Sequence, residues 1–294
     1  MTLYDNGDEV ITRKLDGHWP LVRSINDLVV TTSNNGNLAV LNRKLELLKS
    51  INGSAKQTTS LAVSAQFAAF GNKSGTITFY DTTRGLVKSF YHNQSVTSVD
   101  VQNEYVVSGC TSGEVLTWNM NTSTHMFQFQ HEDKVTCVKI VNRLIVTSSW
   151  DTTARVWSLD DGRHLKKFCH PNKCFNFDIN DKKTLLAVVH GSFLTIWNFL
   201  KGGTFKLSQI ELASMACDVR FNELGKVLVV GLRDGTLYKI SSFDDRKSKC
   251  PTREPGEYND LEKTKSYPYR GLASKSCNYR DRRKRCSKKR NQQR

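Results

Sequence analysis

The chain has no long hydrophobic run. Its 294 residues contain no stretch of about eighteen consecutive apolar residues, the length that a membrane-spanning helix requires. The first ten residues, MTLYDNGDEV, are polar and acidic and lack the apolar segment of a secretory signal peptide. We therefore expect no membrane span, while a hydrophobic content of 38% is ample for a globular core.

Closely paired cysteines are also lacking. The eight cysteines are dispersed along the chain, and none forms a CxxC pair. Cys169 and Cys174 flank His170, but this spacing fits no familiar zinc-binding pattern. A free thiol behaves as a small apolar group inside a protein. We interpret the cysteines as reduced thiols of an intracellular protein and predict neither a metal nor another cofactor.

Signatures of catalysis are missing as well. The sequence has no GxxxxGK[ST] phosphate loop, because the glycines and lysine of Gly71–Gly75 stand in the wrong order. HExxH, GxSxG and the protein-kinase motifs are absent too. We predict that the chain is not an enzyme, has no catalytic residues and takes no small-molecule substrate.

The chain does contain an internal repeat. Trp118, Trp157 and Trp197 each end a short β-patterned run, and they lie 39 and 40 residues apart. A period near forty residues with an aromatic residue closing one strand indicates stacked four-stranded units. Equivalent positions extend the series in both directions: Tyr4, Leu41, Tyr80 and Ile240.

Two further columns of residues keep the same period. His92, His131 and His170 follow one another at intervals of 39 residues, each four residues before an apolar segment. We call the recurring position held by Trp118, Trp157 and Trp197 the aromatic mark. Six residues before each mark from Leu41 onward stands a small or turn-forming residue, as expected between two strands. These turn positions are Asn35, Ser74, Ser112, Asp151, Gly191 and Asp234. Histidines that recur with a repeat are more often structural than catalytic or metal-binding.

The three columns resemble the WD40 repeat family over roughly residues 1–245. The most complete copy spans residues 131–168, with strands expected near Val135–Ile140, Leu144–Ser148, Ala154–Trp157 and Leu165–Phe168. The resemblance implies an all-β WD40 β-propeller with six complete repeats and an N-terminal half repeat.

The resemblance also implies a buried hydrogen-bonded network in the best copy, formed by His131, Ser149, Asp151 and Trp157. Tyr80, Trp118 and Trp197 would take the aromatic position in other repeats. We expect partial networks elsewhere, because Ser74 or Ser112 replaces the aspartate and Gly191 removes the polar group.

The number of blades has two interpretations. Val10–Leu15 could supply the outer strand of the last blade, which would close a six-bladed ring. Alternatively, the first fifteen residues are the last half of a seventh unit, so that the seventh blade is incomplete and the chain is a shortened product. An incomplete ring would expose sheet edges.

Residues 246–294 differ sharply in charge from the rest of the chain. They contain 17 Lys or Arg against 5 Asp or Glu, a net charge of +12, whereas residues 1–245 hold 26 against 23, a net charge of +3. Strand periodicity is lost there, and we predict a disordered basic tail over residues 246–294. Its last part contains a dense cluster of cations: Arg282, Arg283, Lys284, Arg285, Lys288, Lys289 and Arg290.

This cluster has three interpretations. It resembles a nuclear or nucleolar import signal. It could bind RNA or DNA phosphates non-specifically, with a steep dependence on salt. It could also be a solvated tail without a specific partner. No aromatic residue is interleaved with it, which argues against base stacking, and no lipidation site accompanies it, so membrane attachment is not expected.

The family resemblance implies a protein-protein interaction scaffold or adaptor in a multiprotein complex. The basic tail favours a nuclear or nucleolar complex, for instance in ribosome assembly. The alternative is a substrate-recognition subunit of a ubiquitin ligase, similar to F-box/WD40 proteins. No F-box helices precede the repeats, and only Arg155 occupies the position two residues before an aromatic mark where phosphate-reading propellers tend to present arginine.

Overall fold

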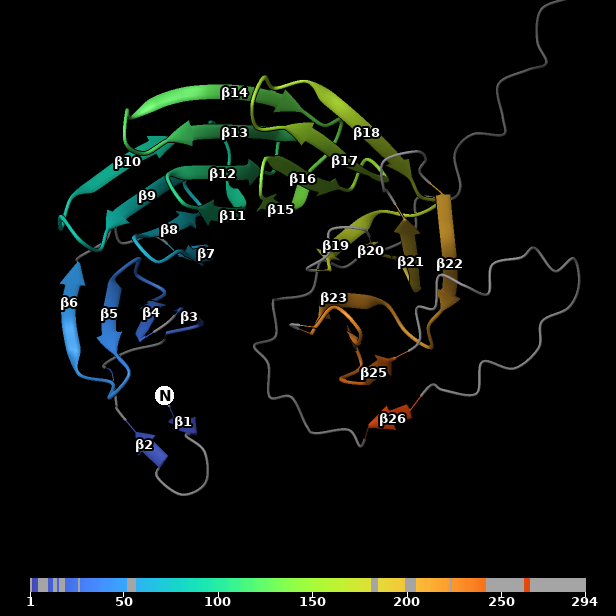
Figure 1. Cartoon of the computed structure of the whole chain (residues 1–294), viewed down its shortest axis with the longest axis horizontal. Coiled ribbons are helices and arrows are strands. Elements are labelled where there is room, and N and C mark those ends of the chain that lie inside the picture. Colours follow the sequence, from blue (N-terminus) through green and yellow to red (C-terminus); the bar gives the residue numbers. More distant parts are fainter. Residues whose placement is uncertain are drawn as a thin grey trace, which may run out of the picture.

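The computed structural model describes residues 2–4, 10–12, 15, 19–25, 27–51, 57–180, 185–198, 205–222, 224–241 and 262–264. Every regular element in these ranges is a β-strand. Six antiparallel four-stranded sheets follow one another around an arc, and each sheet is one blade of a β-propeller (Figure 1). The predicted all-β fold with six complete repeats is therefore confirmed. Within the described ranges no helix is long and apolar enough to cross a membrane.

Each blade takes its four strands in chain order, from the inner to the outer strand. Blade 1 is β3 (Leu21–Ile25), β4 (Leu28–Thr32), β5 (Leu38–Asn42) and β6 (Leu47–Ile51). Blade 2 is β7 (Thr58–Val63), β8 (Phe67–Asn72), β9 (Thr76–Asp81) and β10 (Val87–Tyr91). Blade 3 is β11 (Val96–Gln102), β12 (Tyr105–Cys110), β13 (Glu114–Asn119) and β14 (Thr124–Gln130).

The second half of the arc continues in the same order. Blade 4 is β15 (Val135–Val141), β16 (Leu144–Ser149), β17 (Thr153–Ser158) and β18 (His164–Cys169). Blade 5 is β19 (Cys174–Ile179), β20 (Leu185–His190), β21 (Phe193–Asn198) and β22 (Phe205–Glu211). Blade 6 is β23 (Ala216–Phe221), β24 (Leu228–Leu232), β25 (Leu237–Ile240) and β26 (Glu262–Thr264).

The outer strand of blade 6 comes from the C-terminal side. β26 pairs with β25, with Leu237 opposite Thr264. Strand Val10–Thr12, by contrast, pairs only with Thr2–Tyr4 in a separate two-stranded sheet, β1–β2. The six-bladed interpretation, in which Val10–Leu15 completes the last blade, is therefore wrong. The remainder of residues 246–294, including the cluster Arg282–Arg290, lies outside the described residues, so its disorder stays a prediction.

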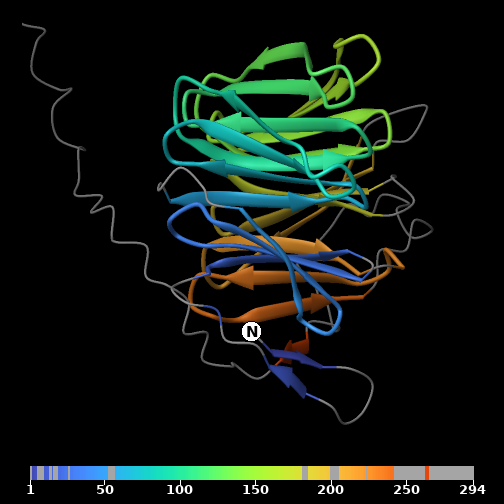
Figure 2. The same cartoon turned by 90° about the vertical axis from the view of Figure 1, so that its left-hand side faces the viewer.

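The core consists of layers between neighbouring blades. Because a middle blade is covered on both sides, its central strands are apolar on both faces, and all six residues of β8 and of β20 are buried. One such layer joins blades 5 and 6 through side chains such as Val189 and Val230. Outer strands are more exposed, as the alternating pattern of β10 shows. Viewed from the side, the blades stack as successive layers (Figure 2).

Candidate functional site

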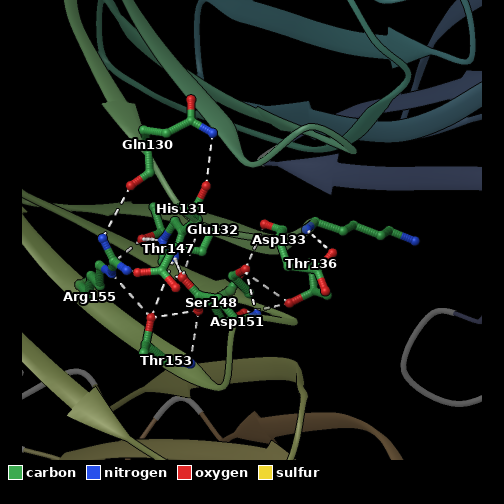
Figure 3. A network of polar contacts seen from close by, with 12 residues as sticks. Gln130, His131, Glu132, Asp133, Thr136, Thr147, Ser148, Asp151, Thr153 and Arg155 are labelled. Atoms are coloured by element: carbon green, nitrogen blue, oxygen red, sulfur yellow. Dashed lines mark hydrogen bonds and ion pairs between the residues drawn. The ribbon is translucent and has the colours of Figure 1, made fainter. Parts of the chain in front are cut away.

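Blade 4 contains a continuous polar network beneath its surface (Figure 3). His131 Nδ1 lies 2.7 Å from an Asp151 carboxylate oxygen, and His131 Nε2 lies 2.8 Å from the Thr147 hydroxyl. Trp157 Nε1 donates to the same hydroxyl at 3.1 Å. The two ring nitrogens of His131 are thus engaged by a carboxylate on one side and a hydroxyl on the other. Every member of this chain is thereby satisfied inside the blade.

Asp151 gathers several further donors. Its carboxylate accepts from the Thr153 backbone N–H and hydroxyl at 2.9 and 2.7 Å, and from Arg155 at 3.0 Å. Burial alone would raise the pKa of this carboxyl, but the hydrogen bonds from His131 and Thr153 outweigh it and hold the pKa well below its usual range. The anion is a structural anchor that ties the β16–β17 turn to the segment before β15.

Three of the four residues expected in this network form it, and the fourth, Ser149, lies beside it. His131, Asp151 and Trp157 come together, and Thr147 is the link between them that the sequence analysis missed. Ser149 takes a different place, because its hydroxyl donates to the Asp133 carbonyl at 2.8 Å and accepts from the Asp151 backbone N–H at 3.0 Å. The signal that could have identified Thr147 is its position two residues before Ser149 on the same face of one strand.

Blade 3 builds a similar network with a displaced carboxylate. His92 Nδ1 lies 2.7 Å from Glu114, and His92 Nε2 lies 2.7 Å from the Ser108 hydroxyl. Ser112 lacks a carboxylate, as the sequence indicates, but Glu114 reaches the histidine from two residues further on. Burial disfavours the imidazolium, yet hydrogen bonds with Cys110 and Glu114 raise the pKa of His92 overall. Ligand atoms of His92, Cys110 and Glu114 lie within 4.8 Å of one another, already engaged in these hydrogen bonds.

In blade 5, buried histidine and tryptophan ring nitrogens lack hydrogen-bond partners. Among the described residues, His170 Nε2, His190 Nδ1 and Trp197 Nε1 are buried and accept or donate no hydrogen bond. The strand register explains why His170 Nε2 and Trp197 Nε1 lack a partner. Thr147, which serves both groups in blade 4, pairs with Val138, and the equivalent pair in blade 5 is Val188 with Phe177. Valine has no hydroxyl. Burial lowers the pKa of His170 to about 3 and that of His190 to about 4, with Lys206 acting in the same direction.

The remaining aromatic marks are core residues. Tyr80 and Trp118 are buried, and Trp197 is half-buried beside Phe168. Cys169 is exposed while Cys174 is buried, and burial raises the pKa of the Cys174 thiol. The described cysteines are all free thiols. None of these side chains forms a reactive constellation with the others.

Basic side chains gather on a partly exposed tryptophan in the loops of blade 4. Lys134 Nζ lies 4.8 Å and Lys173 Nζ 4.2 Å from the centroid of the Trp150 ring. Both distances are within the range of a cation-π interaction. Lys173 Nζ is also 3.5 Å from an Asp133 carboxylate oxygen, which holds it over the ring.

The same loops in other blades add further cations. The Trp150 backbone N–H donates to the Lys134 carbonyl at 2.9 Å, and repeat-equivalent bonds join Lys73 to Gln57 and Arg233 to Met215. Because these bonds are equivalent in the repeat, the residues lie at one end of the propeller, where loops carry binding functions. We call the set Lys134, Trp150 and Lys173 the Trp150 patch.

Comparison with known proteins agrees with the fold. A family model described as WD40, the WD domain or G-beta repeat, matches residues 122–158. The computationally designed Ika8 protein is similar in structure, with a TM-score of 0.71, 22% identity, and coverage of 79% of this chain and 74% of that chain. A chain in the structure of a mitotic checkpoint complex has a TM-score of 0.70, 16% identity, and coverage of 80% and 78%. No curated protein matches the sequence. The chain thus carries a WD40 repeat and folds as a WD40 β-propeller.

Proposed function

We propose that this protein is a non-catalytic interaction scaffold that docks other proteins on the Trp150 patch. The observation that carries the proposal is the partly exposed Trp150 ring with Lys134 and Lys173 both within cation-π distance of it. Tryptophan is enriched among residues that dominate binding energy at protein interfaces, and surrounding charge steers the partner. WD40 propellers are generally protein-interaction modules, which supports this use of the fold.

The charges of the patch select the chemistry of the partner. Two cations, Lys134 and the exposed Lys173, lie over the Trp150 ring, and the Asp133 carboxylate pairs with Lys173 at 3.5 Å. An acidic segment of a partner protein is attracted to such a surface, and one of its apolar residues can cover the indole. The contact then combines desolvated aromatic area with charge complementarity.

The basic tail suggests where this scaffold works. We propose that Arg282–Arg285 with Lys288–Arg290 direct the protein to the nucleus or nucleolus and add non-specific RNA affinity within an assembly such as a ribosome precursor. These residues lie outside the described part of the chain. The alternative proposal, substrate recognition in a ubiquitin ligase, rests on the resemblance of the blade 4 repeat to those of F-box/WD40 proteins. Arg155 does not add to it, because its guanidinium already pairs with Asp151 at 3.0 Å.

Charge reversal in the patch tests the docking surface. Protein carrying Lys134→Glu and Lys173→Glu is compared with wild type by affinity purification and quantitative mass spectrometry. The matched control is Lys49→Glu with Lys167→Glu, which changes net charge equally at exposed outer-strand positions. Partners that are lost with the patch variant and kept with the control support the proposal. An unchanged partner set in both variants contradicts it.

The identity of the partners and the location test the finer proposals. Ribosome-assembly proteins would support the nuclear scaffold, and subunits of a cullin ubiquitin ligase would support the alternative. A fluorescent fusion that lacks residues 280–294 should lose its nuclear enrichment. Nuclear signal that persists in the deletion would refute the import role, and RNA affinity that does not fall with salt would refute phosphate binding.

A further inference from the structure

Three side chains of blade 3 offer metal-ligand atoms of three different kinds. His92 directly follows β10, Cys110 ends β12 and Glu114 begins β13 (Figure 1). Their imidazole nitrogen, thiol sulfur and carboxylate oxygen lie within 4.8 Å of one another. Across the described ranges this is the one group of three such ligand atoms. It lies apart from the Trp150 patch and has no part in the proposed docking.

The thiol of Cys110 is not explained by the hydrogen-bonded network that blade 3 shares with blade 4. The strand register makes Cys110 the blade 3 equivalent of Ser149. The hydroxyl of Ser149 bonds to backbone groups. The Cys110 sulfur instead meets side chains, because it hydrogen-bonds with His92 and lies 3.0 Å from the Ser112 hydroxyl. Blade 3 therefore adds a sulfur ligand beside its histidine and its carboxylate.

Neighbouring polar groups hold two of the ligands in position. The Ser108 hydroxyl lies 2.7 Å from His92 Nε2, so that Nδ1 faces the Glu114 carboxylate at 2.7 Å. The other Glu114 oxygen accepts a hydrogen bond from Gln128 Nε2 at 2.8 Å. Outer contacts of this kind orient the ligands of protein metal sites and fix the tautomer of a ligating histidine. The group thus has the supporting contacts of a site as well as its ligands.

The spacing of the ligand atoms suits a small divalent ion. Bonds of about 2.0–2.3 Å to a tetrahedral ion place neighbouring ligand atoms about 3.3–3.8 Å apart. From 2.7 Å between His92 and Glu114, and at most 4.8 Å between any two ligand atoms, each separation changes by about 1 Å at most. The Glu114 side chain is 15% exposed beside the exposed Ser112, which gives an ion a path from solvent.

We propose that His92, Cys110 and Glu114 bind a zinc ion. Thiolate, imidazole and carboxylate are the ligands that zinc takes in proteins, whereas Mg²⁺ and Ca²⁺ prefer oxygen ligands throughout. On binding, Cys110 releases its thiol proton to solvent, and neutral His92 coordinates through Nδ1 while its Nε2–H donates to Ser108. Three protein ligands leave the fourth position of the ion to water, so the zinc remains exchangeable.

The ion connects three parts of blade 3. It joins the segment between β10 and β11 to the end of β12 and the start of β13, and it therefore stabilises the folded blade. The expectation that the chain binds no metal rested on the lack of closely paired cysteines. The ligands of this site come instead from three positions along the chain, which meet only in the folded blade.

Cobalt serves as the spectroscopic probe, because Co²⁺ occupies zinc sites and a thiolate ligand gives it a charge-transfer band in the near ultraviolet. The full chain is freed of metal with a chelator, titrated with Co²⁺ and then with Zn²⁺. We expect a band that zinc abolishes by displacing the cobalt. Cys110→Ser should remove one bound ion per chain, and the residue it introduces is the one that blade 4 carries at the equivalent position. Glu114→Gln should weaken zinc binding at least tenfold. The matched control is Cys169→Ser at an exposed thiol, which should leave the band and the affinity unchanged.

Thermal unfolding provides a second readout. Zinc should raise the melting temperature of wild type more than that of Cys110→Ser or Glu114→Gln, because an ion that binds the folded chain stabilises it. The inference is overturned if cobalt gives the same band in wild type and Cys110→Ser, or if Cys169→Ser removes the band. An equal zinc-induced rise in all three proteins also overturns it. None of these results affects the docking role of the Trp150 patch.

Discussion

In blade 4 the ring nitrogens of His131 and Trp157 both reach the hydroxyl of Thr147. In blade 5, Val188 stands at the equivalent register position, and His170 Nε2 and Trp197 Nε1 have no hydrogen-bond partner. Threonine and valine have nearly the same shape, so packing is preserved. The polar chain, however, is broken, because a methyl group neither donates nor accepts. The difference shows that repeats of similar outline can differ in how well their interiors are satisfied.

The carboxylate partner is missing from blade 5 as well. Gly191 and Ser192 form the turn that corresponds to the Asp151 turn of blade 4. Counted between equivalent pairs of strand residues, the blade 5 turn is one residue shorter than the blade 4 turn. His190 takes a partner of its own, with Nε2 at 2.7 Å from the Thr195 hydroxyl. We therefore expect blade 4 to be the more stable region and blade 5 to open more readily.

The largest effect should come from removing the carboxylate of the stronger network. Asp151→Ala leaves His131, Thr153 and Arg155 without their shared acceptor, and we expect a loss of about 3–5 kcal/mol in the free energy of unfolding. Urea denaturation measures it. Asp161→Ala, on an exposed turn of the same blade, should leave stability close to that of wild type. Equal effects of the two substitutions would refute the anchoring role of Asp151.

Acidification should act mainly through blade 5. The pKa values of folded His170 and His190 lie near 3 and 4, below the value of about 6.5 expected in the unfolded chain. Unfolding therefore takes up protons, and stability is lost as the pH falls below about 6.5. The Asp151 contribution is retained until about pH 4, because its folded pKa is lowered.

The measurement compares unfolding free energies at pH 7 and pH 5. We expect each blade 5 histidine to account for a loss of up to about 2 kcal/mol over this interval. His170→Asn should lose correspondingly less stability than wild type over the same interval. His92 acts in the opposite sense, since its folded pKa is raised, but it is present in both proteins. Identical pH dependence of the two proteins would contradict the neutral buried state of His170.

Blade 3 sharpens the comparison with a smaller change. Ser108→Ala removes the hydroxyl 2.7 Å from His92 Nε2 but leaves the contact with Glu114. A single buried nitrogen without a partner costs about 1–2 kcal/mol. Thermal unfolding should show this loss, while Ser50→Ala on the exposed outer strand β6 should be close to neutral. A neutral Ser108→Ala would mean that the hydroxyl of the second strand is dispensable in this network.

The repeat period was enough to place most strands. The expected strands of residues 131–168 agree with β15–β18 to within about one residue at each end. The spacing of the tryptophans and the turn residues carries this information, because each blade is a complete local unit. Blade 6 could not be completed in this way, since its fourth strand, Glu262–Thr264, comes from beyond the change in composition at residue 245.

The networks were less predictable than the strands. The histidine and aspartate columns identify which blades contain a polar interior. Whether the hydroxyl of Thr147 or of Ser149 contacts His131 and Trp157, however, depends on how far along the same face of β16 each residue lies. Glu114 was missed because a longer side chain reaches the histidine from a different turn position. The Trp150 patch was missed because Lys134, Trp150 and Lys173 come from three separate loops, whose side chains meet only once the strands of blades 4 and 5 are in place.

The most direct test of the comparison exchanges the two side chains that distinguish the blades. Thr147→Val and Val188→Thr are made separately, and their free energies of unfolding are measured under identical conditions at pH 7. We predict a loss of about 2–3 kcal/mol for Thr147→Val, because two buried groups lose their partner, and a gain of about 1 kcal/mol for Val188→Thr. Changes of the same sign, or no change in either variant, would contradict the claim that this hydroxyl determines the difference between blades 4 and 5.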